Sequence, residues 1–161
     1  MLVDITYETG DEIGVDPLLI LAVMAIESRF NPIAESDSGA KGLMQVIPRY
    51  HLDKLEGNDR EHAALAPEVN IHLGGRVLKE YIDSTGSVEA GLQKYNGALW
   101  DGGNQYAQKI LAERTRYLQV LREQFASQHR DPRARRAGDL ASNAPGAGEN
   151  IAVSDAKSSK L

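Results

Sequence analysis

The sequence of 161 residues predicts a mainly α-helical domain followed by a disordered tail. Apolar residues recur at helical spacing in several segments, and glycine, proline and serine separate these segments. The last 35 residues hold four large aliphatic side chains and no aromatic one, so they cannot bury enough apolar surface to fold. We therefore predict one domain at residues 1–126 and a disordered tail at residues 127–161.

Two helices are predicted in the first part of the chain. The first is the weaker one, spans about residues 5–13 and ends at Gly14. The second begins at about residue 17, because Asp16 suits the capping position and Pro17 suits the first helical position. An Asn-Pro pair at residues 31–32 is expected to end it, because the residue before a proline is disfavoured in a helix.

The segment at residues 33–48 is rich in glycine and serine and then briefly apolar. We interpret it as a loop that leads into one short helical turn, although so short an apolar run also permits a strand.

Three further helices are predicted in the second half of the domain. Pro67 begins one of them and Gly86 ends it. Ser87 caps a short helix that runs through Tyr95, and the last helix begins at about Gln105. The residues expected to be buried on one face of this last helix are Tyr106, Ile110, Tyr117, Leu121 and Phe125.

Charge and composition exclude several functions. The chain has 18 basic and 23 acidic side chains, a net charge of −5, and no cysteine. The excess of acidic side chains lies in residues 1–126. This argues against nucleic-acid binding, because phosphates are bound by clustered Lys and Arg. Without cysteine there is no disulfide and no Cys-ligated metal, and the spacing of His51, His62 and His72 matches no metal-binding pair. We expect no metal and no cofactor.

The longest apolar run is too short for a membrane span. Leu18–Ile26 has nine residues, whereas a membrane-spanning helix needs roughly 20. The first basic residue is Arg29, so the start of the chain lacks the positive charge of a signal peptide. We expect neither a membrane span nor a signal peptide in this chain.

Glu27 is the first candidate for chemistry. The residues three, four and seven positions before it are apolar and share its helical face: Met24, Val23 and Ile20. Burial there, together with the negative end of the helix dipole, would raise the pKa of the Glu27 carboxyl, as a general acid requires. The alternative is an ordinary glutamate that reaches solvent or pairs with Arg29 or Arg76.

Several motifs follow in order around and after Glu27. They are Glu27-Ser28, Phe30-Asn31-Pro32, Ser36, Gly39-Ala40, Gly42-Leu43-Met44-Gln45, Pro48, then Asn70, Gly74 and Leu78, then Tyr95-Asn96-Gly97 and Tyr106. Together they resemble the catalytic domain of the soluble lytic transglycosylases over about residues 5–122. The resemblance implies an α+β, lysozyme-like fold, with a small irregular or β-like lobe and a cleft between this lobe and the helical part.

The resemblance also implies an activity. Such enzymes cleave the β-1,4 bond between N-acetylmuramic acid and N-acetylglucosamine in peptidoglycan without adding water, and leave a 1,6-anhydromuramoyl end. Glu27 takes the catalytic position, first as acid and then as base. The residues that would bind substrate are Ser36, Met44, Gln45, Tyr95, Asn96 and Tyr106.

Three of these residues have specific implied roles. Ser36 would bind the acetamido group, Gln45 would hold that group or the neighbouring sugar, and Met44 would line the cleft. Each also has a structural interpretation, because Ser36 suits a turn, Gln45 a helix end and Met44 the core. Departures from the family pattern include Lys94, where a small residue is usual before Tyr95, and Val77, where a tyrosine is usual.

The resemblance places the enzyme in the cell envelope, periplasmic or secreted. Peptidoglycan glycan strands would be its binding partner. The resemblance is also compatible with a further partner from an envelope assembly, and we expect the protein to be a monomer.

Two other functions stay open at this point. One is a hydrolase like the goose-type lysozymes, which would recruit water through Asp37 or Asp101. The other is a non-catalytic peptidoglycan-binding module of a secretion or pilus assembly. Trp100, in the glycine-rich loop at residues 96–104, either stacks on a sugar or fills the core.

Overall fold

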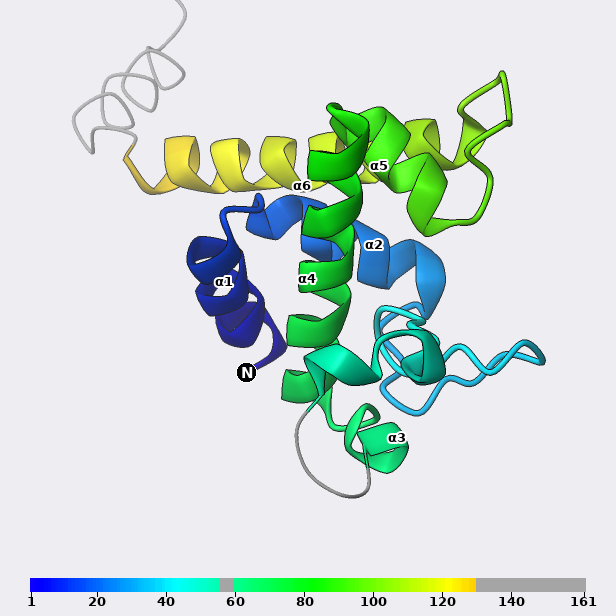
Figure 1. The fold of residues 1–161 in the computed structure, drawn as a ribbon. Helices are drawn as coiled ribbons and strands as arrows, with labels where there is room; N and C mark the ends of the chain where they lie inside the picture. Colours follow the sequence, from blue (N-terminus) through cyan, green and yellow to red (C-terminus); the bar gives the residue numbers. More distant parts are fainter. Residues whose placement is uncertain (56–59, 130–161) are drawn as a thin grey trace, which may run out of the picture. The chain divides into compact units, whose positions relative to one another are not determined.

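The computed structural model describes residues 1–55 and 60–129 (Figure 1). Its helices are α1 (Leu2–Ile13), α2 (Pro17–Glu27), η1 (Pro48–Tyr50), η2 (Leu52–Lys54), α3 (Arg60–Ala63), α4 (Pro67–Thr85), α5 (Val88–Tyr95) and α6 (Gln105–Gln128). The chain divides into two units, Met1–Glu123 and Gln124–Leu161, and the fold and site discussed below belong to the first. The predicted mainly α-helical class is confirmed.

Helix α2 supplies much of the core. Its buried residues are Leu18, Leu19, Ile20, Ala22, Val23 and Met24. The Asp16 carboxylate accepts a hydrogen bond of 2.9 Å from a backbone amide of the first turn, and Pro17 is the first helical residue, which confirms the predicted start. The helix ends at Glu27, ahead of the Asn-Pro pair, and the chain then takes left-handed conformations, with φ of 53° at Arg29 and 63° at Phe30.

Helix α4 packs against both α1 and α5, and Figure 1 shows it, in green, beside them. Its predicted ends are confirmed, since Pro67 is its first residue and Gly86 follows it with a left-handed φ of 77°. The Ser87 hydroxyl accepts a hydrogen bond of 3.2 Å from the Ala90 amide, so the predicted cap of α5 is confirmed as well.

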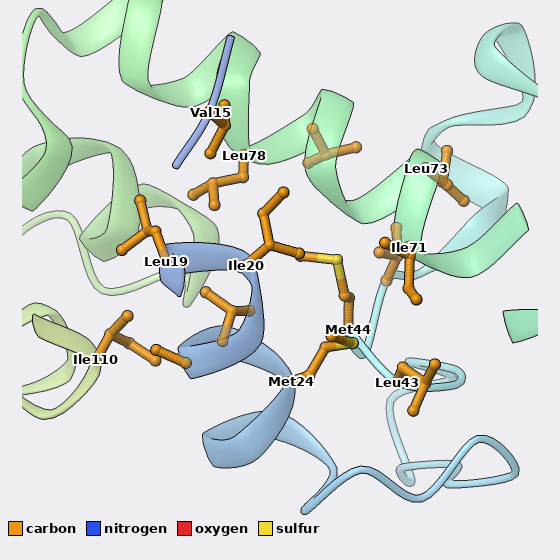
Figure 2. Packing of buried hydrophobic residues seen from close by; sticks show 14 of the residues in the cluster. Val15, Leu19, Ile20, Met24, Leu43, Met44, Ile71, Leu73, Leu78 and Ile110 are labelled. Atoms are coloured by element: carbon orange, nitrogen blue, oxygen red, sulfur yellow. The ribbon is translucent and has the colours of Figure 1, made fainter. Parts of the chain in front are cut away.

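Residues 33–48, called the lobe below, form a β-like turn. Isolated bridges pair Glu35 with Lys41 and Lys41 with Val46. Lys41 and Val46 exchange two backbone hydrogen bonds of 2.8 and 3.2 Å, and the chain turns between them. No helix forms over the short apolar run at residues 43–47, where the strand alternative is closer to the structure, and the helical turn η1 begins only at Pro48. Met44 of the lobe lies in the same buried cluster as Ile20 and Met24 of α2 (Figure 2).

The prediction for α6 is correct in the first half of the helix. Tyr106 and Ile110 are buried and Tyr117 packs against the core. Leu121 and Phe125 are 43% and 65% exposed, so their predicted burial is wrong. Helical spacing identifies residues that share a face, but it does not show whether another element covers that face.

The end of the predicted domain falls inside a helix. Residue 126 lies within α6, and residues 130–161, most of the predicted tail, lie outside the described residues. The domain boundary and the disorder of the tail stay predictions. Within the described ranges, no helix has both the length and the apolar character needed to cross a membrane.

We predict that Gly74→Ala destabilises the domain. A Cβ at Gly74 would lie 2.6 Å from the Cβ and the Sδ of Met44, so α4 and the lobe would have to separate. Overpacking should outweigh the better helix propensity of alanine and lower the free energy of unfolding by about 1–2 kcal/mol, measured by urea denaturation. The matched control is Gly102→Ala, because nothing lies within 4 Å of its added Cβ. Equal stability of the two variants would contradict the tight contact.

Candidate active site

The candidate site is a cleft of about 440 Å³ bordered by the end of α2, the lobe, α4 and α5. Five of the site residues expected from the sequence line it: Glu27, Ser36, Gln45, Tyr95 and Asn96. Residues that the sequence analysis did not assign to the site also line it, including Tyr50, His51 and Tyr81. Helical spacing can place Tyr81 on one face of α4, but it does not separate a core face from a cleft wall.

Glu27 is the last residue of α2, and its carboxyl group is half-buried in the cleft. The hydroxyl of Tyr106 donates a hydrogen bond of 2.5 Å to its Oε1. Burial raises the pKa of Glu27, while the bond from Tyr106 acts in the opposite direction and is the weaker influence. The predicted rise in the pKa of Glu27 is confirmed. Among the described residues no cation forms an ion pair with Glu27, so the alternative of pairing with Arg29 or Arg76 is not seen.

Tyr106 reaches Glu27 from the core side. Its ring is only 9% exposed, at the start of α6, and its hydroxyl is directed to the carboxyl of Glu27. Burial and the neighbouring carboxyl raise the pKa of Tyr106, so its hydroxyl keeps its proton and acts as a donor. Tyr106 therefore holds the acid in place without being part of the cleft lining.

Three side chains hold the lobe against the helical part of the domain. The Ser28 hydroxyl, just after α2, donates to the Leu43 carbonyl at 2.7 Å. The Asn70 Oδ1, in α4, accepts from the Met44 amide at 2.8 Å. The Tyr95 hydroxyl, at the end of α5, donates to the Met44 carbonyl at 2.8 Å. These bonds fix the backbone that carries Gln45.

Gln45 and Ser36 are held by local hydrogen bonds. Gln45 has a left-handed φ of 49°, and its Nε2 donates to the carbonyls of Ala34 at 3.1 Å and Gly42 at 3.0 Å. The amide nitrogen is thus occupied, which leaves Oε1 as the group of Gln45 that can meet a ligand in the cleft. The Ser36 Oγ accepts from the Ala40 amide at 3.0 Å and still lines the cleft.

For Met44 and Trp100, the structure decides between the two interpretations that the sequence allows. Met44 is fully buried between the lobe and α4 and adds no surface to the cleft, so its expected role in lining the cleft is not supported and the core interpretation is correct. Trp100 is 93% exposed, so it does not fill the core. Packing against Gly74 decides the position of Met44, and the motif alone does not show this contact.

Gln93 is a buried residue that the sequence analysis missed. It is 1% exposed, its Nε2 donates to the Ala98 carbonyl at 3.0 Å, and its Oε1 accepts from the Ala107 amide at 2.9 Å. It therefore ties the loop after α5 to the start of α6, where Tyr106 lies.

The cleft contains one carboxylate among its described lining residues, that of Glu27. Asp101 accepts hydrogen bonds from the amides of Gly103 and Gln105 at 3.1 and 3.3 Å at the start of α6, and Asp37 is exposed; neither lines the cleft. In the described part of the chain, no cluster of His, Asp and Glu is arranged to hold a metal ion. The arrangement can therefore donate and accept a proton at one carboxyl group.

The sequence of this helical domain, whose described cleft lining carries one half-buried acid, matches a known class of protein. The model of the Transglycosylase SLT domain family matches residues 5–119. The chain belongs to this family.

Curated relatives match parts of the chain. It is 40% identical over 80 residues to endo-type membrane-bound lytic murein transglycosylase A of Klebsiella pneumoniae, which covers 46% of this chain and 39% of the relative. It is 36% identical over 84 residues to the transglycosylase of Enterobacteria phage PRD1, covering 52% and 30%. It is 29% identical over 143 residues to membrane-bound lytic murein transglycosylase C of Glaesserella parasuis, covering 88% and 30%. The chain spans well under half the length of these relatives.

Solved structures support the fold. The 70 kDa soluble lytic transglycosylase of Escherichia coli superposes with a TM-score of 0.65 at 20% identity, over 73% of this chain and 24% of that protein. An inactive mutant of the lytic transglycosylase Slt of Pseudomonas aeruginosa gives the same TM-score of 0.65 at 21% identity, with the same coverage of 73% and 24%. The predicted lysozyme-like architecture is confirmed at the level of the fold.

We predict that Glu27→Gln is more stable than the wild type at high pH and equally stable at low pH. The folded-state pKa of Glu27 is raised above its ordinary value of 4.5, so both proteins carry a neutral side chain at low pH and should be equally stable there. As the pH rises through the folded-state pKa, only the wild type must bury a charge, and its free energy of unfolding should fall below that of the variant. Urea denaturation at a series of pH values measures the difference. A difference that does not change with pH would contradict the buried acid.

We also predict that Tyr106→Phe raises the pKa of Glu27 further. The variant keeps the ring and removes the hydroxyl that stabilises the charged carboxylate. NMR titration of the Glu27 side-chain carboxyl carbon measures the shift without any substrate. Tyr7→Phe is the matched control, because Tyr7 is 39% exposed in α1 and does not line the cleft. A titration of Glu27 that is unchanged in Tyr106→Phe, or moves to lower pH, is the contrary result.

Proposed function

We propose that this domain is a peptidoglycan lytic transglycosylase. It would cleave the β-1,4 bond between N-acetylmuramic acid and N-acetylglucosamine and leave a 1,6-anhydromuramoyl end. The observation that carries the proposal is that Glu27, with its raised pKa, provides the one carboxyl group among the described residues that line the cleft. Ordinary glycosidases flank the bond with two carboxylates about 5–9.5 Å apart. A cleft with one acid favours a reaction in which the substrate supplies the nucleophile.

The proposed reaction uses Glu27 twice. The neutral carboxyl gives its proton to the glycosidic oxygen while the bond from that oxygen to C1 of the muramic acid breaks, and the 2-acetamido oxygen supports the electron-deficient C1. The 6-hydroxyl of the same sugar then bonds to C1, and its proton passes to the Glu27 carboxylate. Glu27 ends as it began, and no water is consumed. A raised pKa of Glu27 serves both steps.

The other cleft residues have supporting roles in this proposal. Tyr106 holds the Glu27 carboxyl by its hydrogen bond and keeps it facing the cleft. Ser36 and the Oε1 of Gln45 are the polar groups of the lobe that would receive the acetamido group or the neighbouring sugar. The Tyr95 ring forms a wall, because its hydroxyl is already bonded to the lobe, and the exposed Asn96 supplies an amide at the rim.

The relatives support the substrate and the place of action. Their names describe lytic murein transglycosylases, several of them membrane-bound. We propose glycan strands of peptidoglycan as the substrate and the cell envelope as the place of action. The hydrolase alternative is weaker, because Asp37 and Asp101 do not line the cleft and offer no base for a water molecule there.

We predict that digestion of purified peptidoglycan yields anhydro ends and that Glu27→Gln stops it. Mass spectrometry distinguishes the ends, because anhydro products are lighter than reducing products by one water molecule. Loss of the general acid should lower the rate by at least about 10²-fold. Asp37→Asn is the matched control, because it removes one exposed carboxylate outside the cleft and should leave the rate unchanged. Reducing ends would indicate a hydrolase, and no release by the wild type would favour a binding module.

A further inference from the structure

Lys94 places a positive charge in the wall of the cleft. It belongs to the last turn of α5, and its side chain is half-buried beside Tyr95 and Asn96. Its Nζ donates to the Ser84 Oγ at 2.9 Å and lies 4.7 Å from the centre of the Tyr81 ring. A hydrogen bond and a cation–π contact thus hold the ammonium group in a defined position.

This ammonium group has no acidic partner in the described part of the chain. Three of the other four lysines there pair with carboxylates: Lys41 with Glu35, Lys54 with Asp53 and Glu80, and Lys79 with Asp83; the fourth, Lys109, is exposed on α6 outside the cleft. For Lys94 the described residues provide only the neutral contacts to Ser84 and Tyr81. A held cation without a counterion in a ligand cleft leaves its charge available to a bound anion.

The other titratable groups of the cleft leave this charge uncompensated before substrate is bound. Burial lowers the pKa of His51, so its imidazole is neutral at neutral pH. Burial raises the pKa of Tyr95 well above its ordinary value, so this tyrosine of the cleft wall carries no charge at that pH. Glu27 is the group whose protonation the proposed reaction uses. Lys94 is therefore the fixed positive charge of the described cleft wall.

The position of Lys94 is also one where the chain departs from the pattern it resembles. A small residue is usual before the Tyr-Asn pair, so at this point of the cleft wall the chain carries a charged side chain where that pattern has none.

We propose that Lys94 is a specificity-determining residue that binds a carboxylate of the glycan strand. This inference rests on the proposed function, because the carboxylates of that substrate belong to the muramic acid. They occur in two places, on the lactyl group of a muramic acid without peptide, and on the peptide stem of a muramic acid that carries one. In both cases the oriented ammonium donates a charge-assisted hydrogen bond to the carboxylate.

Binding to three ligands separates these sources. The first is a neutral oligomer of N-acetylglucosamine, the second a peptide-free glycan strand with lactyl carboxylates, and the third a strand with peptide stems. Titration calorimetry in the Glu27→Gln background measures the dissociation constants without turnover. The two proposals can fail separately. If the proposed reaction is wrong, the wild type releases no anhydro ends, whereas calorimetry measures binding and tests the role of Lys94 independently.

We predict that Lys94→Met weakens binding of a carboxylate-bearing strand about fivefold to tenfold and leaves the neutral oligomer unaffected. Lys94→Arg should restore most of the affinity, because it restores the charge. The strand that loses affinity identifies the carboxylate. Lys109→Met is the matched control, because Lys109 is an exposed lysine of α6 outside the cleft and its loss changes the net charge equally.

Three results would overturn the proposal. One is equal affinity of Lys94→Met and the parent protein for both carboxylate-bearing strands. Another is an equal loss on the neutral oligomer, which would mean that Lys94 only shapes the cleft. The third is the same loss in Lys109→Met, which would assign the effect to overall charge. In a protein that keeps Glu27 and therefore turns over, we expect Lys94→Met to raise KM and to leave kcat nearly unchanged.

Discussion

The buried amide of Asn70 is the contact on which the arrangement of the site depends. Its Oδ1 accepts from the Met44 amide at 2.8 Å, and its Nδ2 donates to the carbonyls of Lys41 at 2.9 Å and Ala64 at 2.7 Å. The side chain is fully buried, so loss of this amide would leave the Met44 amide and the Ala64 carbonyl buried without a hydrogen-bond partner. One residue of α4 thus sets the register of the lobe, and with it the position of Gln45.

This anchor works because the backbone comes unusually close at two glycines. A Cβ at Gly42 would collide with the Asn70 amide, and a Cβ at Gly74 would collide with Met44. The lobe is therefore held by polar contacts and close packing in a chain that has no cysteine to form a disulfide. Ser28 belongs to the same system, since it follows Glu27 and bonds to the Leu43 carbonyl. Ser28, the residue next to the acid Glu27, thus connects the end of α2 directly to the lobe.

The sequence predicts much of the fold because local chemistry decides it. The caps at Asp16 and Ser87 and the glycine after α4 mark helix ends through contacts within a few residues, and the acid at Glu27 follows from the apolar stripe of its own helix. The burial of Met44 and the exposure of Leu121 depend on elements distant in sequence. Periodicity contains no information about such partners, so these positions were not predictable from it.

The charge of the domain makes the local arrangement of its cleft important. Residues 1–126 carry 12 basic and 19 acidic side chains, and the proposed substrate is itself anionic. At physiological ionic strength, repulsion between exposed charges is largely screened beyond about 8 Å, so the net charge acts weakly on a bound strand. The ammonium group of Lys94, held by Ser84 and Tyr81, acts at contact distance, where screening is small. An acidic domain can therefore bind an anionic polymer when one wall of its cleft carries an oriented positive charge, and selectivity then depends on where the strand carries its carboxylates.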